Sequence, residues 1–300
     1  MAGVRIGTAE ASSTFLGQGL ALKAVLERVP ALAPVDVSTS GHASVENANR
    51  LQSGDIDFGF MASNWVGCAK NGEAPFAQKI DLRMVAPMNA GPLFFIARAD
   101  SRLRGVRDLR GRRVVVGPEK SGMAQHARVI LGTLDTTFDD ITPLYLDFAA
   151  GAEALVAGDA DAQLQCPIPN KVMTDLAARV LIRVLSYAAA DLSTLLGAVP
   201  FYRRTVMRKG AIRGLDADVA QAAVVNVLVS HARVADDMVR EVTSAIFAAR
   251  NELPRLNALF DGMAELFNPL RTEGAAALEF GDVPFHPGAA AAYRAAGLLT

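Results

Sequence analysis

The stretch TSGHASVENANRLQSGDIDFGFMASN, residues 39–64, shows how the chain is built. An apolar segment before it, residues 35–38, is typical of a short strand. Apolar residues then recur at helical spacing up to Gly54, a residue type that often ends helices, and Ser44 is a suitable N-cap with Asn47 three positions on. A second apolar run, residues 56–61, completes a strand–helix–strand unit, whose strands we expect to be parallel.

Small polar residues follow both strands of this unit. In an open parallel sheet, ligands bind beyond the carboxyl ends of the strands. The segments 40–44 and 62–64 fall at such ends. We therefore predict that both segments contribute to a ligand site.

The same order of strand, small-residue loop and helix recurs three times. It is found in residues 4–29, in residues 113–131 and in residues 161–177. The N–H groups at such helix starts attract anions. Ser12, Ser13 and Thr14 suit helix capping as well as ligand contact, and the two roles are compatible.

The loop of residues 117–122 superficially resembles a phosphate-binding loop. That motif needs Lys after its second Gly, and the chain has Met123 there. Nucleotide binding is therefore rejected, whereas carboxylate binding stays open.

Two lobes are expected, residues 1–95 with 223–300 and residues 96–222. Further strands are expected at residues 82–86, 93–97 and 180–185, a short helical turn at 105–109, and a mainly helical tail from Asp236. The apolar run 222–229 suits a buried strand, although its periodicity does not exclude a helix. Because no low-complexity linker lies between the lobes, we expect a strand-like connection.

The composition narrows the class of protein. With 51% hydrophobic and 20% charged residues the chain can bury a large core, and a net charge of -1 argues against a nucleic-acid partner. Arginines between residues 102 and 113 are interpreted as a solvated face, ahead of a nucleic-acid patch. Cys68 and Cys166 do not decide the compartment. No signal peptide is recognised, so the chain is expected to be either cytoplasmic or a mature form.

No catalytic constellation is found. The four histidines lack metal-ligand spacing, and no GxSxG elbow is present. Asp55 and Asp57 lie at a strand start, away from the carboxyl end, which argues against paired-carboxylate chemistry. His42 and Trp65 suit either ligand contact or a structural role. We expect neither an enzyme nor a metal or other cofactor.

Several short motifs follow one another along the whole chain. The strongest is Ser44-Val45-Glu46-Asn47, then Leu51, then residues 53–57, of the form GSvEN…L…G.aD. The others are residues 108–114, residues 116–118 with 121–122, residues 158–162 with 169–170, and residues 285–289 with 293–297. In this order the motifs resemble the TAXI-type extracytoplasmic solute receptors of TRAP transporters.

This resemblance implies an α/β, two-lobed periplasmic-binding-protein fold of the type II kind, with a ligand cleft between lobes. It also implies export to the periplasm, a small organic acid as ligand and TRAP membrane permease subunits as partners. The alternative is a cytoplasmic ligand sensor or enzyme on the same fold. The family's first loop, TGGxGGTYYP, is replaced here by residues 8–17, in which Phe15 and Leu16 replace a polar aromatic pair. We therefore expect an organic acid other than glutamate.

The resemblance and the strand-end loops together give the candidate ligand-binding residues. A clamp on the carboxylate is expected from Thr14, Ser44, Asn64, Ser121 and Asn170. The complete set of candidates is Thr8, Ser13, Thr14, Phe15, His42, Ser44, Val45, Asn64, Ser121, Gly122, Met123, Pro169 and Asn170.

Overall fold

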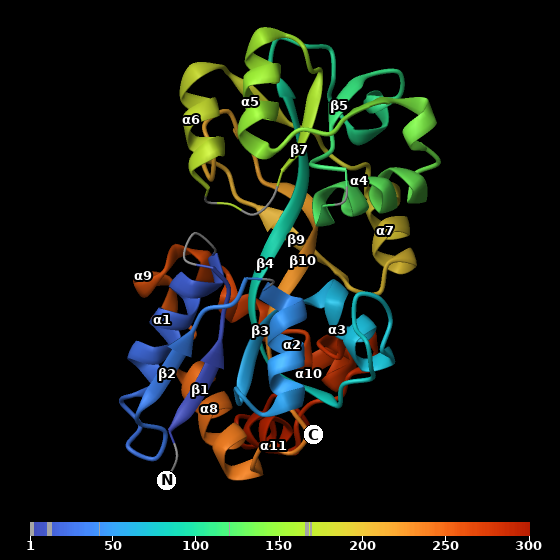
Figure 1. The fold of residues 1–300 in the computed structure, drawn as a ribbon. Coiled ribbons are helices and arrows are strands. Elements are labelled where there is room, and N and C mark those ends of the chain that lie inside the picture. The colour runs from blue at the N-terminus through green and yellow to red at the C-terminus, as the bar shows by residue number, and fades with distance from the viewer. Residues whose placement is uncertain (1–2, 11–13, 42, 120, 166–167, 169) are drawn as a thin grey trace. The chain divides into compact units, whose positions relative to one another are not determined.

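The computed structural model describes the chain except residues 1–2, 11–13, 42, 120, 166–167 and 169 (Figure 1). The chain divides into two compact units. Unit 1 comprises residues 1–90 and 225–300, and unit 2 comprises residues 91–224. The sequence-based boundaries stand after residues 95 and 222, a few residues away.

Unit 1 is built on a mixed sheet. Its strands are β1 (Val4–Gly7), β2 (Val35–Ser38), β3 (Phe58–Ala62), β4 (Leu82–Arg98) and β10 (Val219–His231). They are ordered β2-β1-β3-β10-β4. β1 is parallel to both β2 and β3, which confirms the predicted parallel unit, whereas β10 is antiparallel to β3.

The helices of unit 1 follow the strands in chain order. They are α1 (Thr14–Leu26), α2 (Ala43–Ser53), α3 (Ser63–Asn71), α8 (Asp236–Ala248), α9 (Leu253–Leu256), α10 (Leu270–Glu273) and α11 (Pro287–Ala295). The helical tail is confirmed. Its last long helix is fixed to the sheet by the buried Tyr293, whose hydroxyl donates to the Val85 carbonyl at 2.7 Å.

Unit 2 repeats the strand–helix order around a second set of strands. The strands are β5 (Arg113–Val115), β6 (Thr142–Leu144), β7 (Ala162–Gln165), β8 (Ile182–Val184) and β9 (Tyr202–Met207). β5 is parallel to β6 and β7, whereas β4 is antiparallel to β7 and β8. The helices are α4 (Gly122–Thr133), α5 (Phe148–Ala157), α6 (Lys171–Arg179) and α7 (Ala189–Ala198), with a short 3-10 turn at Val106–Leu109.

The connection between the units consists of strands. Residues 82–98 form one strand of 17 residues, so the prediction of two separate strands is wrong. Pro87, Gly91 and Pro92 would be expected to interrupt a strand. In the structure, however, the strand changes its partners in this region, from β10 to β7 and β8, so fewer backbone N–H donors are needed there. β10 crosses in the opposite direction, which decides the open alternative for residues 222–229 in favour of a strand. The expected strand-like connection is confirmed.

Among the described residues, no helix is both long and apolar enough to cross a membrane.

Candidate solute-binding site

The first candidate region is the edge of unit 1 where the parallel strands β1, β2 and β3 end. We call this edge rim 1. Thr8, which is fully buried, joins the ends of the strands: its hydroxyl donates to the Ser38 carbonyl at 2.9 Å. Its own carbonyl accepts from the Ser40 hydroxyl and from Asn47 Nδ2, both at 2.8 Å. These hydrogen bonds fix the polar groups of rim 1, and Thr8 has a structural role there as a buried residue.

Ser44 and Asn47 do not cap α2, so that prediction is wrong. The helix already begins at Ala43, and Ser44 Oγ accepts from the Ala62 N–H at 3.0 Å. Asn47 Nδ2 also donates to the Phe60 carbonyl at 2.9 Å. Both side chains face the sheet because glycines let α2 approach: a Cβ at Gly7 would lie 2.6 Å from Asn47 Oδ1.

The other candidates of unit 1 occupy different environments. Phe15 is 8% exposed and packs 5.4 Å, between ring centroids, from Phe60, so it is a core residue in this structure. Thr14 begins α1, Val45 lies in α2 and Asn64 in α3, all three partly exposed. Ser13 and His42 lie outside the described residues.

Three amide side chains at rim 1 escaped the sequence-based selection. Asn89 Oδ1 accepts from Gln18 Nε2 at 3.0 Å and from Asn226 Nδ2 at 3.1 Å. Gln18 is fully buried and Asn89 is 3% exposed, whereas Asn226 is partly exposed. We call these residues the amide trio. Each lies within an apolar run of the sequence. A polar residue in such a run is expected to need a buried hydrogen-bond partner, and this pattern could have pointed to the three residues.

The amide trio belongs to rim 1 through its neighbours. Asn226 is paired with Ala62, the last residue of β3. The adjacent Val225 N–H donates to Ser63 Oγ at 3.2 Å, within the predicted segment 62–64. Gln18 lies one helical turn beyond Thr14, where α1 begins.

In unit 2 the helices that follow the parallel strands begin at polar caps. Ser121 Oγ accepts from the Ala124 N–H at 3.2 Å at the start of α4. Asn170 Oδ1 accepts from the Met173 N–H at 2.8 Å at the start of α6 and so caps this helix. Gly122 is exposed, and Met123 is half-buried. Pro169 lies outside the described residues. We call these strand ends and helix starts rim 2.

Gln165, the last residue of β7, also lies at rim 2 and was missed. Its side-chain nitrogen and oxygen are both buried, and neither has a hydrogen-bond partner among the described residues. Two residues earlier on the same face of β7, Gln163 Nε2 donates to the Phe148 carbonyl at 3.0 Å. A buried amide left without any partner costs about 1–3 kcal/mol, so Gln165 calls for a functional explanation.

His126 lies one turn inside α4 in an aromatic group. Its Nδ1 is 2.8 Å from the hydroxyl of Tyr202, and the two ring centroids are 5.7 Å apart. Burial lowers the pKa of His126 from 6.5 to about 4, so the ring is neutral at pH 7. No group of three or more potential metal ligands occurs within the part of the chain that the structure describes.

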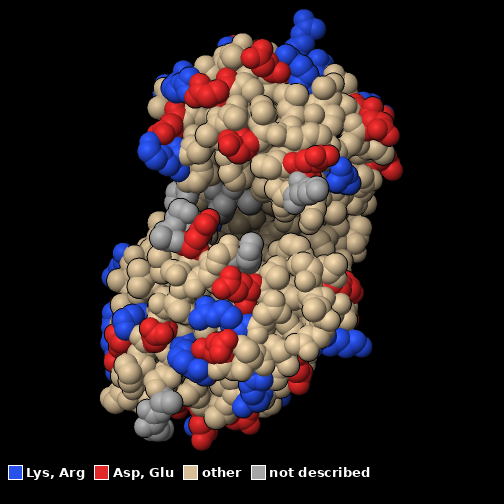
Figure 2. All heavy atoms as spheres, viewed as in Figure 1, with Lys and Arg blue, Asp and Glu red and all other residues tan. Residues whose placement is uncertain are grey.

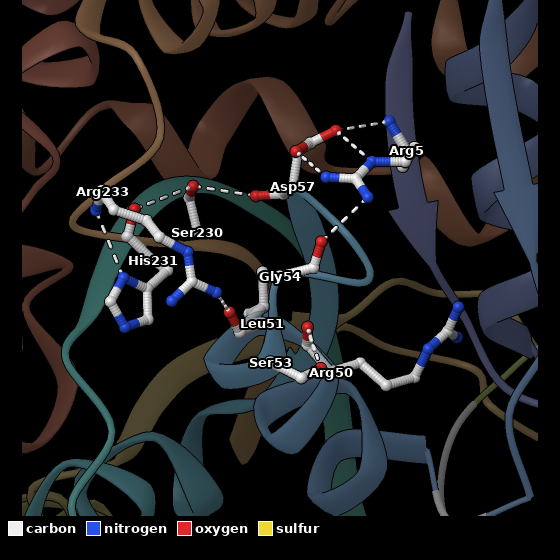
Figure 3. Close-up of polar contacts among 9 residues, drawn as sticks. All are labelled: Arg5, Arg50, Leu51, Ser53, Gly54, Asp57, Ser230, His231 and Arg233. Atoms are coloured by element: carbon white, nitrogen blue, oxygen red, sulfur yellow. Dashed lines mark hydrogen bonds and ion pairs between the residues drawn. The ribbon is translucent and has the colours of Figure 1, made fainter. Parts of the chain in front are cut away.

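Charged residues gather at the opposite edge of unit 1 (Figure 3). Arg5 binds the Asp57 carboxylate through Nε at 3.0 Å and Nη2 at 2.7 Å, and its Nη1 donates to the Gly54 carbonyl at 2.8 Å. Arg233 donates to the carbonyls of Leu51 and Gln52. Two guanidinium groups therefore neutralise the negative, carboxyl end of α2. Asp57 lies directly before β3, as expected from the sequence, and its carboxylate has a structural role in binding Arg5.

The predicted solvated arginine face of unit 2 carries acidic partners. Arg107 pairs with Asp191 and Arg113 with Asp161, each at 2.8 Å, and all these arginines are more than 40% exposed. On the face drawn in Figure 2, basic and acidic side chains are interspersed. Such mixed charge does not form the basic stripe of a nucleic-acid-binding protein.

Comparison with known proteins places the fold. The profile of the NMT1-like family matches residues 6–297. A TctC solute-binding protein from Polaromonas superposes with a TM-score of 0.60 at 13% identity, covering 94% of this chain and 96% of that one. The putative periplasmic sulfonate-binding protein SsuA of Methylobacillus flagellatus KT gives 0.59 at 12% identity, covering 99% and 96%.

The periplasmic aliphatic sulphonate-binding protein SsuA of Escherichia coli gives a TM-score of 0.50 at 17% identity, covering 98% of this chain and 83% of that chain. Identities this low concern the fold alone. The predicted fold class is confirmed: the chain has the α/β fold of two-lobed periplasmic solute-binding proteins.

Proposed function

The chain belongs to the NMT1-like family, and on that premise we propose that it is a periplasmic receptor that captures a small organic acid and delivers it to a TRAP-type membrane permease. The three proteins compared above are named as solute-binding proteins rather than enzymes. A receptor for a solute is therefore the well-supported part of the proposal. The organic acid, the TRAP partner and the TAXI subtype remain predictions.

The observation that carries the proposal is Gln165. Its buried side-chain donor and acceptor have no partner among the described residues, and buried polar groups without partners are costly. Gln165 lies at the carboxyl end of β7, the end at which ligands bind in parallel sheets. We infer that its amide contacts the captured solute.

The acidic character of the solute is supported by the helix starts. The first N–H groups of α4 and α6 lie at rim 2, and N–H groups at helix starts favour anions. The two SsuA proteins are named for sulfonates, whose anionic oxygens accept hydrogen bonds as carboxylate oxygens do. Both observations therefore favour a solute with an anionic head group.

A thermal-shift screen against dicarboxylates, amino acids, aromatic acids and alkanesulfonates tests this proposal. A ligand that binds only the folded state raises the melting temperature by mass action. We expect a selective shift with one class of acid and no chemical change of that acid. Turnover of the acid would indicate an enzyme, and the absence of a shift with every acid would contradict the proposal.

Two matched variants locate the site. Gln165→Leu removes polar atoms that have no partner in the described part of the chain, so we expect unchanged or higher stability of the ligand-free protein and loss of the ligand-induced shift. Gln163→Leu, on the same face of the same strand, loses the bond to Phe148 and should be less stable while keeping the shift. If both variants keep the shift, Gln165 is not part of the site.

The predicted contact of Ser121 needs a control for helix capping. Ser121→Ala removes the cap of α4, and Asp147→Ala removes an equivalent cap of α5, where Asp147 Oδ1 accepts from the Ala150 N–H at 2.8 Å. Each variant should lose about 1 kcal/mol of stability. We expect the ligand-induced shift to shrink only in Ser121→Ala. An equal decrease in both variants would assign Ser121 a structural role.

A further inference from the structure

The amide trio has an arrangement that allows two hydrogen-bonding states. Asn89 Oδ1 receives two donors, one from Gln18 and one from Asn226. This leaves Gln18 Oε1 buried and without a partner among the described residues. An amide group has nearly the same shape when its oxygen and nitrogen change places.

The inverted state is equally well paired inside the trio. If all three amides turn over together, Asn89 Nδ2 can donate one hydrogen to Gln18 Oε1 and one to Asn226 Oδ1. The buried atom of Gln18 that does not face Asn89, which we call its outward atom, then changes from an acceptor to a donor. Turning only one of the three amides would place two oxygens or two N–H groups against each other, so the trio inverts as a unit.

We propose that the amide trio contacts the solute at rim 1 and inverts to match it. A carboxylate needs donors and selects the inverted state, whereas a hydroxyl or ammonium group selects the state with Gln18 Oε1 outward. This inference rests on the proposed solute-receptor function. The amide trio would therefore offer the solute either a hydrogen-bond donor or an acceptor, without a charged side chain.

Two substitutions add the same charge but fix opposite states. In Asn89→Asp the central carboxylate can only accept, so Gln18 must keep its nitrogen inward and its oxygen outward. In Asn226→Asp the end carboxylate can only accept, so Asn89 turns its nitrogen toward it and Gln18 turns its nitrogen outward. Both variants are measured at pH 8, where an Asp carboxyl group is normally ionised.

Isothermal titration of the wild type and both variants, with acids and with uncharged polyols or amines, tests the inference. For an acidic solute we expect Asn89→Asp to bind about tenfold more weakly than Asn226→Asp. In Asn89→Asp, Gln18 turns an oxygen toward the anion, whereas in Asn226→Asp it offers the anion an N–H donor. For a hydroxyl-bearing or amine solute the order should reverse. Equal affinities of the two variants in both classes would overturn the inference.

The two proposals fail in different ways. If the wild type binds a polyol or amine but no acid, the organic-acid function falls, and the reversed order of the variants still supports the trio. If the wild type binds an acid and the variants are equal, the function stands and the trio falls. Gln18→Met, which adds no charge, guards against misfolding of the Asp variants: it should weaken binding about tenfold, and an unchanged affinity would overturn the inference.

Discussion

At the scale of single residues, His126 couples stability to pH. Burial lowers the pKa of its ring to about 4 in the folded protein, against about 6.5 in the unfolded chain. Above pH 6.5 the ring is neutral in both states, so its titration does not lower the free energy of unfolding. Between pH 6.5 and 4 only the unfolded chain takes up the proton, and the folded state loses about 3 kcal/mol.

Urea unfolding of the wild type and His126→Gln from pH 7 to 4 measures this loss. Gln can still bond to Tyr202 but does not titrate, so the difference in unfolding free energy between the two proteins should change by about 3 kcal/mol across the window. The pKa values of His231 and His286 are also lowered, chiefly by burial, and both residues remain in the variant as a constant background. Parallel curves would contradict the assignment.

Asp57 gives a second prediction at this scale. Its carboxylate holds Arg5 at two points and is 14% exposed. Asp57→Asn brings an amide N–H group toward the guanidinium donors, and we expect a loss of about 2 kcal/mol in urea unfolding. Asp55→Asn, in the same loop, changes only an exposed hydrogen bond from Ser53 and a weaker electrostatic attraction to Arg5, and should cost less than about 0.5 kcal/mol. Equal losses would show that the pair with Arg5 is unimportant.

At the scale of elements, Asn47 fastens α2 to the ends of two strands. Its Nδ2 donates to the carbonyls of Thr8 and Phe60, and both oxygens are held inside the protein. Asn47→Leu has a similar shape but no donor, so we expect a loss of about 3 kcal/mol in the free energy of unfolding. Asn71→Leu removes an exposed amide bonded to Glu73 and serves as the control, with a change below about 0.5 kcal/mol. Similar losses for both would contradict the role of Asn47.

The same elements show what the sequence could reveal. Apolar periodicity located α2, β3 and the parallel pairing, because these depend on local pattern. The positions of Ser44 and Asn47 could not be predicted, because a serine followed by a polar residue three positions on suits both a cap and a contact with the sheet. The glycines of β1 and β3 decide between the two, and only the fold brings them together.

The candidate site was predictable only in part. The polar loops at strand ends and the caps of α4 and α6 follow from local sequence. The amide trio does not, since Gln18, Asn89 and Asn226 are brought together from three distant segments. Sequence-based reasoning favoured polar residues in loops, whereas these amides are held in a helix and two strands.

At the scale of the whole molecule, the chain passes between its units through buried strands. Residues 84–97 of β4 and 221–231 of β10 are almost completely buried. Limited digestion with subtilisin should therefore cut exposed loops such as residues 208–211 and produce no fragment that ends within either crossing. Mass spectrometry of the fragments gives the answer. A stable fragment of residues 91–224 would show that the crossings behave as linkers instead.

The strand order of unit 1 has a consequence for synthesis on the ribosome. β10 lies between β3 and β4 in the sheet, yet it is made more than a hundred residues after them, once residues 91–224 have emerged. The nascent chain thus holds an incomplete first sheet with its central place empty while the second unit is already whole. The last part to be translated closes the first part, and we expect unit 1 to stay incompletely folded until the final quarter of the chain is available.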